Sequence, residues 1–440
     1  MEQDDNKRDY YEELAFVRGA QTPPLCSRSP RCPLMIHPGN HFISYFIVPV
    51  SVSPLASSFP LRLAAADQAL GDLTSFNAEH GYLEALVRGF RSGFLREYEY
   101  RQLTQCEVLD DVKVTLGDTD YGSTLQNANK LTPEVIVDKC WEKLIEEFDH
   151  LRSQAVGPLN TFLNMITYEY MIDNVAFLIT SLVKGGDPAV LLAKCDPLGR
   201  FPRMRSVATF ENNEDGLFEL FSTVLVDTPI APYFEEYFLN EGKAESSSGF
   251  DEMHRVFSDV EIEIISNMLK KFWLEDFYRY CETLGGTTWE IMEELLSFEA
   301  DRRAISITIN SFGTELNEPV ERETKRRALY ASFGRLYPEG IQEFTKVNDM
   351  QRLQQVLEKY EPFRSLFAQS QRDGKDFEDV MQQYEVELCK RAYEQQSHFA
   401  VFYAFIKLKV QERKNIYWIT ECIHQKQKEP SKINRWIKTF

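Results

Sequence analysis

The densest cluster of charged residues in the chain combines acids and bases within five consecutive positions. It consists of Glu299, Asp301, Arg302 and Arg303, and the apolar Ile305 follows it. Such groups can exchange protons in catalysis or can neutralise one another in ion pairs. On a half-buried helix, arginines flanked by carboxylates usually form structural ion pairs. We therefore predict a structural ion-pair network here rather than a catalytic site.

A second charged face occurs earlier in the chain. Tyr168, Glu169, Tyr170 and Asp173 form the corresponding face in this earlier helical segment. This face receives the same interpretation, and we add Asp173 to the residues that we expect in structural ion pairs.

Two acidic segments resemble metal sites only in part. Residues 118–122 begin like a calcium-binding loop, but the glycine stands at position five instead of six, and Asn129 replaces the final glutamate. The pair Asp110-Asp111 lacks the further carboxylate one helical turn later that a magnesium-diphosphate site needs, because Val114 stands there. We interpret the first segment as a helix end and the second as a solvated helix face.

Motifs of nucleotide binding, zinc proteolysis and serine hydrolysis are absent from the sequence. The seven histidines are dispersed, and the close pair His37 and His41 lies in a proline-rich stretch. The eight cysteines include no Cys-x-x-Cys pair, so we expect reduced, mostly buried thiols in a cytosolic protein. We expect no catalytic residue, no cofactor and no metal ion.

Helices must position these residues, because helical periodicity dominates from about Gly81 onward. Between Val137 and Leu151, apolar side chains recur at steps of three and four, and Pro133 stands near the first turn. Strictly alternating patterns, which would indicate strands, are scarce. We therefore predict an all-α fold.

Two further helical tracts have recognisable ends. The first opens at Ser258 with the spacing of a capping box and ends at Gly285-Gly286, after which Thr287 or Thr288 can cap the next helix. The second begins near Asp376 or Asp379 and continues to Gln425 with a break.

One helical unit is repeated three times along the chain. Similar segments end one helix, pass through a polar turn and start another; they are residues 116–125, 225–234 and 357–366. A long helix and then a second helix follow each segment, and the second helix carries a polar-aliphatic signature; the signatures are residues 173–175, 301–303 and 414–416. The separation from Leu116 to Asn174 equals that from Leu357 to Asn415, 58 residues.

These repeats predict three similar helical subdomains, which could be arranged around a pseudo-threefold axis. Their approximate bounds are residues 76–195, 196–325 and 326–440. Together they form a body at 73–440, preceded by an extension at 1–72.

The extension differs in composition from the body. Eight of the 19 prolines fall in the first 60 residues, which indicates poorly structured chain. Its apolar run at 42–52 is too short to cross a membrane, which takes about 20 residues. We interpret residues 1–72 as a disordered tail or a product of gene-model choice.

The charge balance restricts the partners. The chain carries 68 acidic and 49 basic residues, a formal net charge of −19. Phosphate binding needs a basic face, so nucleic acid is excluded as the main partner, and unaided binding to anionic lipid is disfavoured. We expect partners that are proteins, and no direct insertion into a membrane.

Five long strings resemble the subunit d family of eukaryotic vacuolar-type proton ATPases, and the similarity runs from about Phe76 to the C-terminus. The strings are GYLEALVRGFRSGFL (81–95), ITYEYMIDNVAFLIT (166–180), FEADRRAISITINSFGTEL (298–316), GRLYPEG (334–340) and FYAFIKLKVQERKNIYWITECI (402–423).

Two positions depart from the family pattern. Asp196 stands where the family tends to carry histidine, and the insert around Glu241 to Phe250 is longer than usual.

The resemblance implies a funnel-shaped, all-helical protein of three similar subdomains, with a related counterpart in archaeal-type ATPases. It implies a non-catalytic subunit of the membrane sector that couples rotation of the central stalk, driven by ATP hydrolysis, to the proteolipid ring. The implied partners are the proteolipid c-ring, the central-stalk subunits and other membrane-sector subunits such as subunit a. The implied location is the cytosolic face of vacuolar and endosomal membranes, as a peripheral membrane protein.

Two alternatives remain open from the residues alone. One is a helical adaptor or scaffold unrelated to the pump. The other is a metal-dependent all-α enzyme, for which the sequence offers no third carboxylate ligand.

Overall fold

Helices account for most of the chain that the structure describes, and no strand occurs among these residues. The computed structural model describes residues 75–126, 128, 130–184, 186–204, 227–241, 259–426, 433 and 436–440, all within one compact unit. The all-α prediction is confirmed. The predicted extension at 1–72, the insert at 242–250 and the capping residue Ser258 lie outside the described residues.

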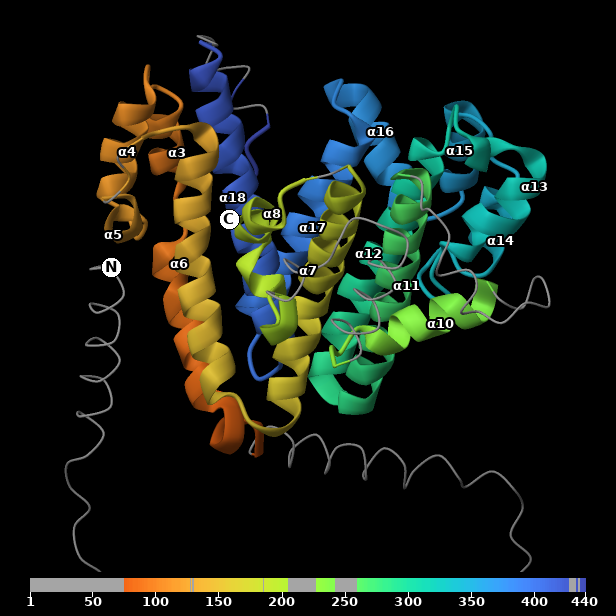
Figure 1. Cartoon of the computed structure of the whole chain (residues 1–440), viewed down its shortest axis with the longest axis horizontal. Coiled ribbons are helices and arrows are strands. Elements are labelled where there is room, and N and C mark those ends of the chain that lie inside the picture. Colours follow the sequence, from red (N-terminus) through yellow and green to blue (C-terminus); the bar gives the residue numbers. More distant parts are fainter. Residues whose placement is uncertain are drawn as a thin grey trace, which may run out of the picture. The chain divides into compact units, whose positions relative to one another are not determined.

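A first helix covers residues 75–89, and the other α-helices follow in chain order (Figure 1). They are α3 (Glu97–Leu103), α4 (Leu109–Gly117), α5 (Gly122–Leu125), α6 (Pro133–Gln154), α7 (Gly157–Val183), α8 (Pro188–Lys194), α10 (Ala231–Glu241), α11 (Asp259–Leu284), α12 (Gly286–Asn310), α13 (Pro319–Glu321), α14 (Glu339–Phe344), α15 (Met350–Leu357), α16 (Phe363–Asp373), α17 (Phe377–Glu394) and α18 (Ala400–His424). The long tract predicted to reach Gln425 with a break is confirmed as α17 and α18.

Local chemistry explains why α6 begins where it does. The Thr132 hydroxyl accepts a hydrogen bond from the Val135 N–H at 3.3 Å, and Pro133 occupies the first turn, where its missing N–H costs nothing. The predicted apolar face from Val137 to Leu151 is buried, apart from Ile145, which is half-buried. The predicted helix is therefore confirmed.

The junction between α11 and α12 differs from the prediction. Gly285 and Gly286 have φ values of 63° and 53°, a backbone conformation that side chains with a Cβ rarely adopt. The expectation that Thr287 or Thr288 caps the next helix is wrong, because α12 already begins at Gly286 without a side-chain cap. The Thr288 hydroxyl instead accepts a hydrogen bond from the Phe399 N–H at 3.0 Å.

Six long helices pack against one another in a closed order. The helix pairs α6–α7, α11–α12 and α17–α18 are each joined by a short turn and are in contact. Between pairs, α7 packs on α11, α12 packs on α17, and α18 packs on α6. Contacts therefore lead from α6 through all six helices and back to α6.

The described residues form two hydrophobic cores. The larger core lies among the six long helices and includes Phe148, Phe162, Trp273 and Phe405, all fully buried. The smaller core joins α3, α4 and α5 to the first half of α6 and the last half of α18 (Figure 1). Helices α3, α4 and α5 thus pack both on α6, the first of the six long helices, and on α18, the last of them.

Polar side chains on the second helix of two pairs hold the chain that returns beside them. On α7, the Asn174 side chain donates to the Asp196 carbonyl at 2.9 Å and accepts from the Asp196 N–H at 2.7 Å. On α18, Asn415 makes the same two bonds to Lys438, at 2.6 and 3.3 Å. Each amide satisfies both backbone groups of one residue, which fixes the returning segment against the helix.

On α12 a carboxylate performs the corresponding task. Asp301 is 1% exposed and accepts hydrogen bonds from the N–H groups of Arg335 and Leu336, at 3.0 and 3.1 Å. The preceding Gly334 has φ of 114°, and a Cβ there would lie 2.5 Å from an Asp301 oxygen. Only glycine fits this close approach between loop and helix.

We expect Gly334→Ala to lower the free energy of unfolding by at least about 2 kcal/mol, because the new Cβ meets both an unfavourable φ and the Asp301 carboxylate. Urea denaturation followed by circular dichroism measures the change. Gly89→Ala is the control, since Gly89 is helical with open space around it and should gain up to about 1 kcal/mol. Equal stability of the two variants would contradict this account of the loop.

Candidate functional site

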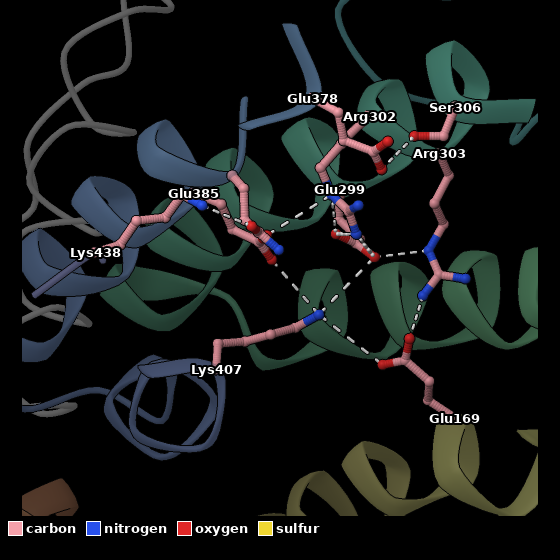
Figure 2. Close-up of polar contacts among 10 residues, drawn as sticks. Glu169, Glu299, Arg302, Arg303, Ser306, Glu378, Glu385, Lys407 and Lys438 are labelled. Atoms are coloured by element: carbon pink, nitrogen blue, oxygen red, sulfur yellow. Dashed lines mark hydrogen bonds and ion pairs between the residues drawn. The ribbon is translucent and has the colours of Figure 1, made fainter. Parts of the chain in front are cut away.

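An ion-pair network surrounds Glu299 on α12 (Figure 2). Glu299 is 2% exposed, and its carboxylate accepts hydrogen bonds from Arg302 at 2.8 Å and from the Arg303 Nε at 2.7 Å. These arginines stand three and four residues later, so the helical geometry by itself brings them to the same face. The structure thus places three of the five predicted ion-pair residues together.

Side chains from three other helices complete the network. The Lys407 Nζ on α18 lies 3.9 Å from Glu169 on α7, 3.9 Å from Glu299 and 3.6 Å from Glu385 on α17. Figure 2 shows this ammonium between the three carboxylates. Arg303 also pairs with Glu169, and the Arg302 Nε lies 3.7 Å from Glu385. Three acids and three bases therefore balance at a point where α7, α12, α17 and α18 meet.

The charges of the network hold one another ionised. Burial acts to raise the pKa of Glu299, but the charges of Arg302, Lys407 and Arg303 outweigh it and hold this pKa well below its usual value. Burial likewise acts to lower the pKa of Lys407, and the surrounding charges, Glu299 foremost, hold it well above its usual value. Neither Glu299 nor Lys407 is suited to exchange a proton near neutral pH. The arrangement can bind helices together, and it does not resemble an acid–base site.

The other two predicted residues lie apart from this network. Asp301 faces the loop at 334–336, as described above. Asp173 on α7 forms an ion pair at 2.5 Å with Lys270 of the adjacent α11. Arg302 and Asp173 line the same hollow, but no ion pair between the two is found in the described part of the chain.

The hollow beside the network has a volume of about 170 Å³. Residues of the same four helices line it: Glu169, Tyr170, Asp173, Arg302, Glu385, Val386, Cys389, Lys407, Leu408, Val410, Gln411 and Lys414. Burial raises the pKa of Cys389, so this thiol is poorly suited to act as a nucleophile or metal ligand. Within the described ranges, no group of three histidine, cysteine or acidic side chains is arranged to hold a metal ion.

Sequence reasoning missed Lys407 and Glu385. A signal for Lys407 exists, because it stands inside the apolar run of residues 400–410, where an unpaired charge would be costly to bury. A partner for it had to exist, but the spacing along the chain does not identify Glu385, since the two residues lie on different helices.

A second buried pair ties α18 to the start of the body. Lys409 and Glu412 are 3% and 4% exposed and lie 2.9 Å apart. Lys409 also donates to the Gly93 carbonyl at 2.8 Å, and Glu412 accepts from the Leu95 N–H at 2.6 Å and from the Tyr121 hydroxyl. Helix α18 therefore contacts α7, α12 and α17 through Lys407, and it contacts the segment at 93–121 through Lys409 and Glu412.

None of the helices that the structure describes is sufficiently long and apolar to cross a lipid bilayer.

We expect Lys407→Met to lower the free energy of unfolding by about 3–5 kcal/mol, because the substitution leaves the buried Glu299 with less compensating charge and removes a partner of Glu169 and Glu385. Urea denaturation measures the change. Adding Glu299→Gln should recover part of the loss, since it removes the charge left uncompensated.

Lys390→Met is the matched control for this prediction. Lys390 pairs at 3.2 Å with Glu387, an exposed residue on its own helix, and such pairs contribute about 1 kcal/mol or less. If Lys407→Met costs no more than Lys390→Met, the network does not hold the four helices together.

Asp301 generates a prediction about pH. Burial raises the pKa of Asp301 from 3.8 to about 7, although the two backbone N–H groups oppose this. The folded state therefore retains a proton that the unfolded chain releases, so this group's contribution to stability falls by about 1.4 kcal/mol per pH unit between pH 4 and pH 7. We expect Asp301→Asn to remove this part of the pH dependence.

The same substitution should also cost about 1–3 kcal/mol at pH 5, because the NH2 group of asparagine cannot accept a hydrogen bond from the second loop N–H, whereas the hydroxyl oxygen of the protonated carboxyl group can. Urea denaturation at several pH values between 4 and 8 measures both effects. Glu290→Gln, at an exposed position on the same helix, is the control. An unchanged pH dependence in Asp301→Asn would show that Asp301 is ionised throughout this range.

Comparison with known proteins identifies relatives over nearly the whole described region. The family model for the ATP synthase (C/AC39) subunit matches residues 83–433. A probable V-type proton ATPase subunit d of Oryza sativa is 46% identical over 359 residues, which cover 81% of this chain and 96% of the relative. V-type proton ATPase subunits d of Dictyostelium discoideum and Saccharomyces cerevisiae are 44% and 36% identical, over 84% and 83% of this chain and 98% and 99% of the relatives.

Proposed function

The chain belongs to the ATP synthase (C/AC39) subunit family, and we propose that it is the subunit d of a V-type proton ATPase, where it couples rotation of the central stalk to the proteolipid ring. The observation that carries this proposal is that the chain is 46% identical to a probable subunit d and aligns with 96% of that protein's length. Two observations support the coupling role: the sequence resembles this family, and the six long helices are closely packed against one another.

A coupler must transmit torque without deforming, and the helix packing supports this requirement. The six long helices contact one another in a closed order, and the Lys407 network links four of them where they meet. Closely packed interiors are nearly incompressible, so a force on one helix pair is carried to the others. Glu299 and Lys407 hold each other ionised, so neither side chain exchanges a proton near neutral pH, and this supports a non-catalytic role for the site.

We propose that the body at 73–440 consists of three similar helical subdomains, residues 76–195, 196–325 and 326–440, related by a pseudo-threefold axis and forming a funnel. The order of contacts supports this: the second helix of each pair packs on the first helix of the next pair, in all three cases. The clamps made by Asn174, Asp301 and Asn415 also recur on the three second helices. We propose that residues 1–72 are an extension that the family does not share, because the family model begins at residue 83 and the relatives are covered almost completely by 81–84% of the chain.

We further propose that the c-ring, the central-stalk subunits and subunit a are its partners, on the cytosolic face of vacuolar and endosomal membranes. The net charge of −19 supports attachment through other proteins, since anionic lipid would repel such a surface. The inner helices of the body are proposed to receive the stalk. A helical adaptor unrelated to the pump is the alternative, and the identities to subunits d do not favour it.

Removal of this chain from the cells that make it tests the proposed coupling. We expect ATP hydrolysis by the soluble sector to persist while ATP-driven acidification of membrane vesicles is lost, because the link between the two motors is missing. Re-expression of the full chain is the control and should restore acidification. Acidification that continues without the chain, or a tagged chain that purifies without proteolipid and stalk subunits, would reject the proposal.

A further inference from the structure

Two carboxyl groups pair with one lysine at the boundary between the two hydrophobic cores. Asp120 lies in the turn between α4 and α5, next to Tyr121 of the smaller core. Glu147 lies on α6, next to Phe148 of the larger core. We call Asp120 and Glu147 the carboxyl pair. Neither the coupling role nor the Lys407 network uses these residues.

One ammonium group holds both members of the carboxyl pair. The Lys143 Nζ lies 3.9 Å from an Asp120 oxygen and 3.8 Å from the Glu147 Oε1. Glu147 is 8% exposed, and its other oxygen, Oε2, is buried without a hydrogen-bond partner among the described residues. A buried carboxylate oxygen without a donor is costly, unless the group carries a proton that it can share with a neighbour.

Asp120 supplies that neighbour, and the backbone leaves it little freedom to move away. Its negative charge and its capacity to accept a proton from Glu147 both favour the protonated form of Glu147. Asp120 also lies close to Gly93, where a Cβ would be 2.6 Å from the Asp120 Oδ2. The turn at 118–121 is therefore held between Gly93 and α6.

The charged groups that face Glu147 come from four elements. Burial raises its pKa to about 7, and Asp120 contributes to the rise, while Lys409 on α18 and Lys143 on α6 oppose it. On α17 the Tyr393 phenol faces the same region, and burial raises its pKa so that it stays neutral. The two lysines are too few and too distant to stabilise both carboxylates fully, since each is shared with another acid.

We propose that Asp120 and Glu147 form a proton-sensitive fastener between the smaller core and the six-helix body, closed when they share a proton and loosened when both are ionised. In the closed state the turn at 118–121 is bonded to α6 and holds α4 and α5 in place. When Glu147 releases its proton to solvent, two negative charges face each other beside a limited number of cations. The region at 109–125 then opens more often, and it does so within the pH range of the cytosol.

The sign and size of the effect follow from linkage. A carboxyl group with a pKa of about 7 when closed and 4.5 when exposed favours the closed state at low pH, and this preference is lost as the pH rises to 7. The opening equilibrium should therefore rise about tenfold between pH 6 and pH 8.

Amide hydrogen exchange of the purified full chain, followed by mass spectrometry, tests the fastener. The exchange rate of each peptide is divided by the intrinsic exchange rate at the same pH. For peptides from residues 109–125 we expect this ratio to be about tenfold higher at pH 8 than at pH 6, because the open state is about tenfold more populated. Peptides from α15, which carries no group with a pKa near 7, serve as an internal reference and should show no such increase. The test needs no other pump subunit, so its result is independent of the proposed function.

Three variants make the result specific to the carboxyl pair. Glu147→Gln should abolish the increase, and Asp120→Asn should shift it to lower pH, because the charge that disfavours ionisation of Glu147 is removed. Glu146→Gln, an exposed neighbour on α6, should behave as the unmodified chain does. An absent increase in the unmodified chain, or an increase of the same size in Glu147→Gln, would overturn the proposal.

Discussion

The rest of the structure depends on how the charge of Glu299 is compensated. This carboxylate is almost completely buried, and burial of an unpaired charge would oppose folding. Arg302 and Arg303 compensate it from the same helix, and Lys407 does so from α18, which then needs Glu169 and Glu385 as further partners. The requirement for neutrality therefore recruits side chains from four helices. Ion pairs of this kind add little net stability, but they favour one arrangement of the helices over others, because any other arrangement leaves a buried charge unpaired.

Around this centre, the long helices alternate with segments whose positions are set by single polar side chains. Asn174 and Asn415 each bind both backbone groups of one returning residue, and Asp301 binds two successive N–H groups. Short connections without regular structure carry unpaired backbone groups, which must find partners when they pack on a core. These three side chains provide them. The arrangement explains why the second helix of each pair carries a buried polar residue where a returning segment packs against it.

Under the proposed function, the buried charges and the two apolar cores determine which parts of the subunit are rigid and which can open. The network and the larger core make the six helices move as one body, while the smaller core, which α3, α4 and α5 share with α6 and α18, has the carboxyl pair at its boundary with that body. A coupler needs the first property to transmit torque. The second allows one region of the same subunit to respond to conditions in the cytosol without loss of the body's rigidity.

Short-range patterns in the sequence were enough to predict the all-α fold and the course of α6, α17 and α18, because apolar periodicity, an N-terminal proline and a threonine cap act within one or two turns. The same is true of the expected proximity of Glu299, Arg302 and Arg303, which share one helix face. The tertiary structure alone decided that Lys407 and Glu385 join them, that Asp301 instead binds a loop, and that Asp173 pairs with Lys270. The physical reason is that an ion pair within a helix depends on spacing of three or four residues, whereas a pair between helices depends on how separate segments pack together, as the 134 residues between Glu169 and Arg303 illustrate.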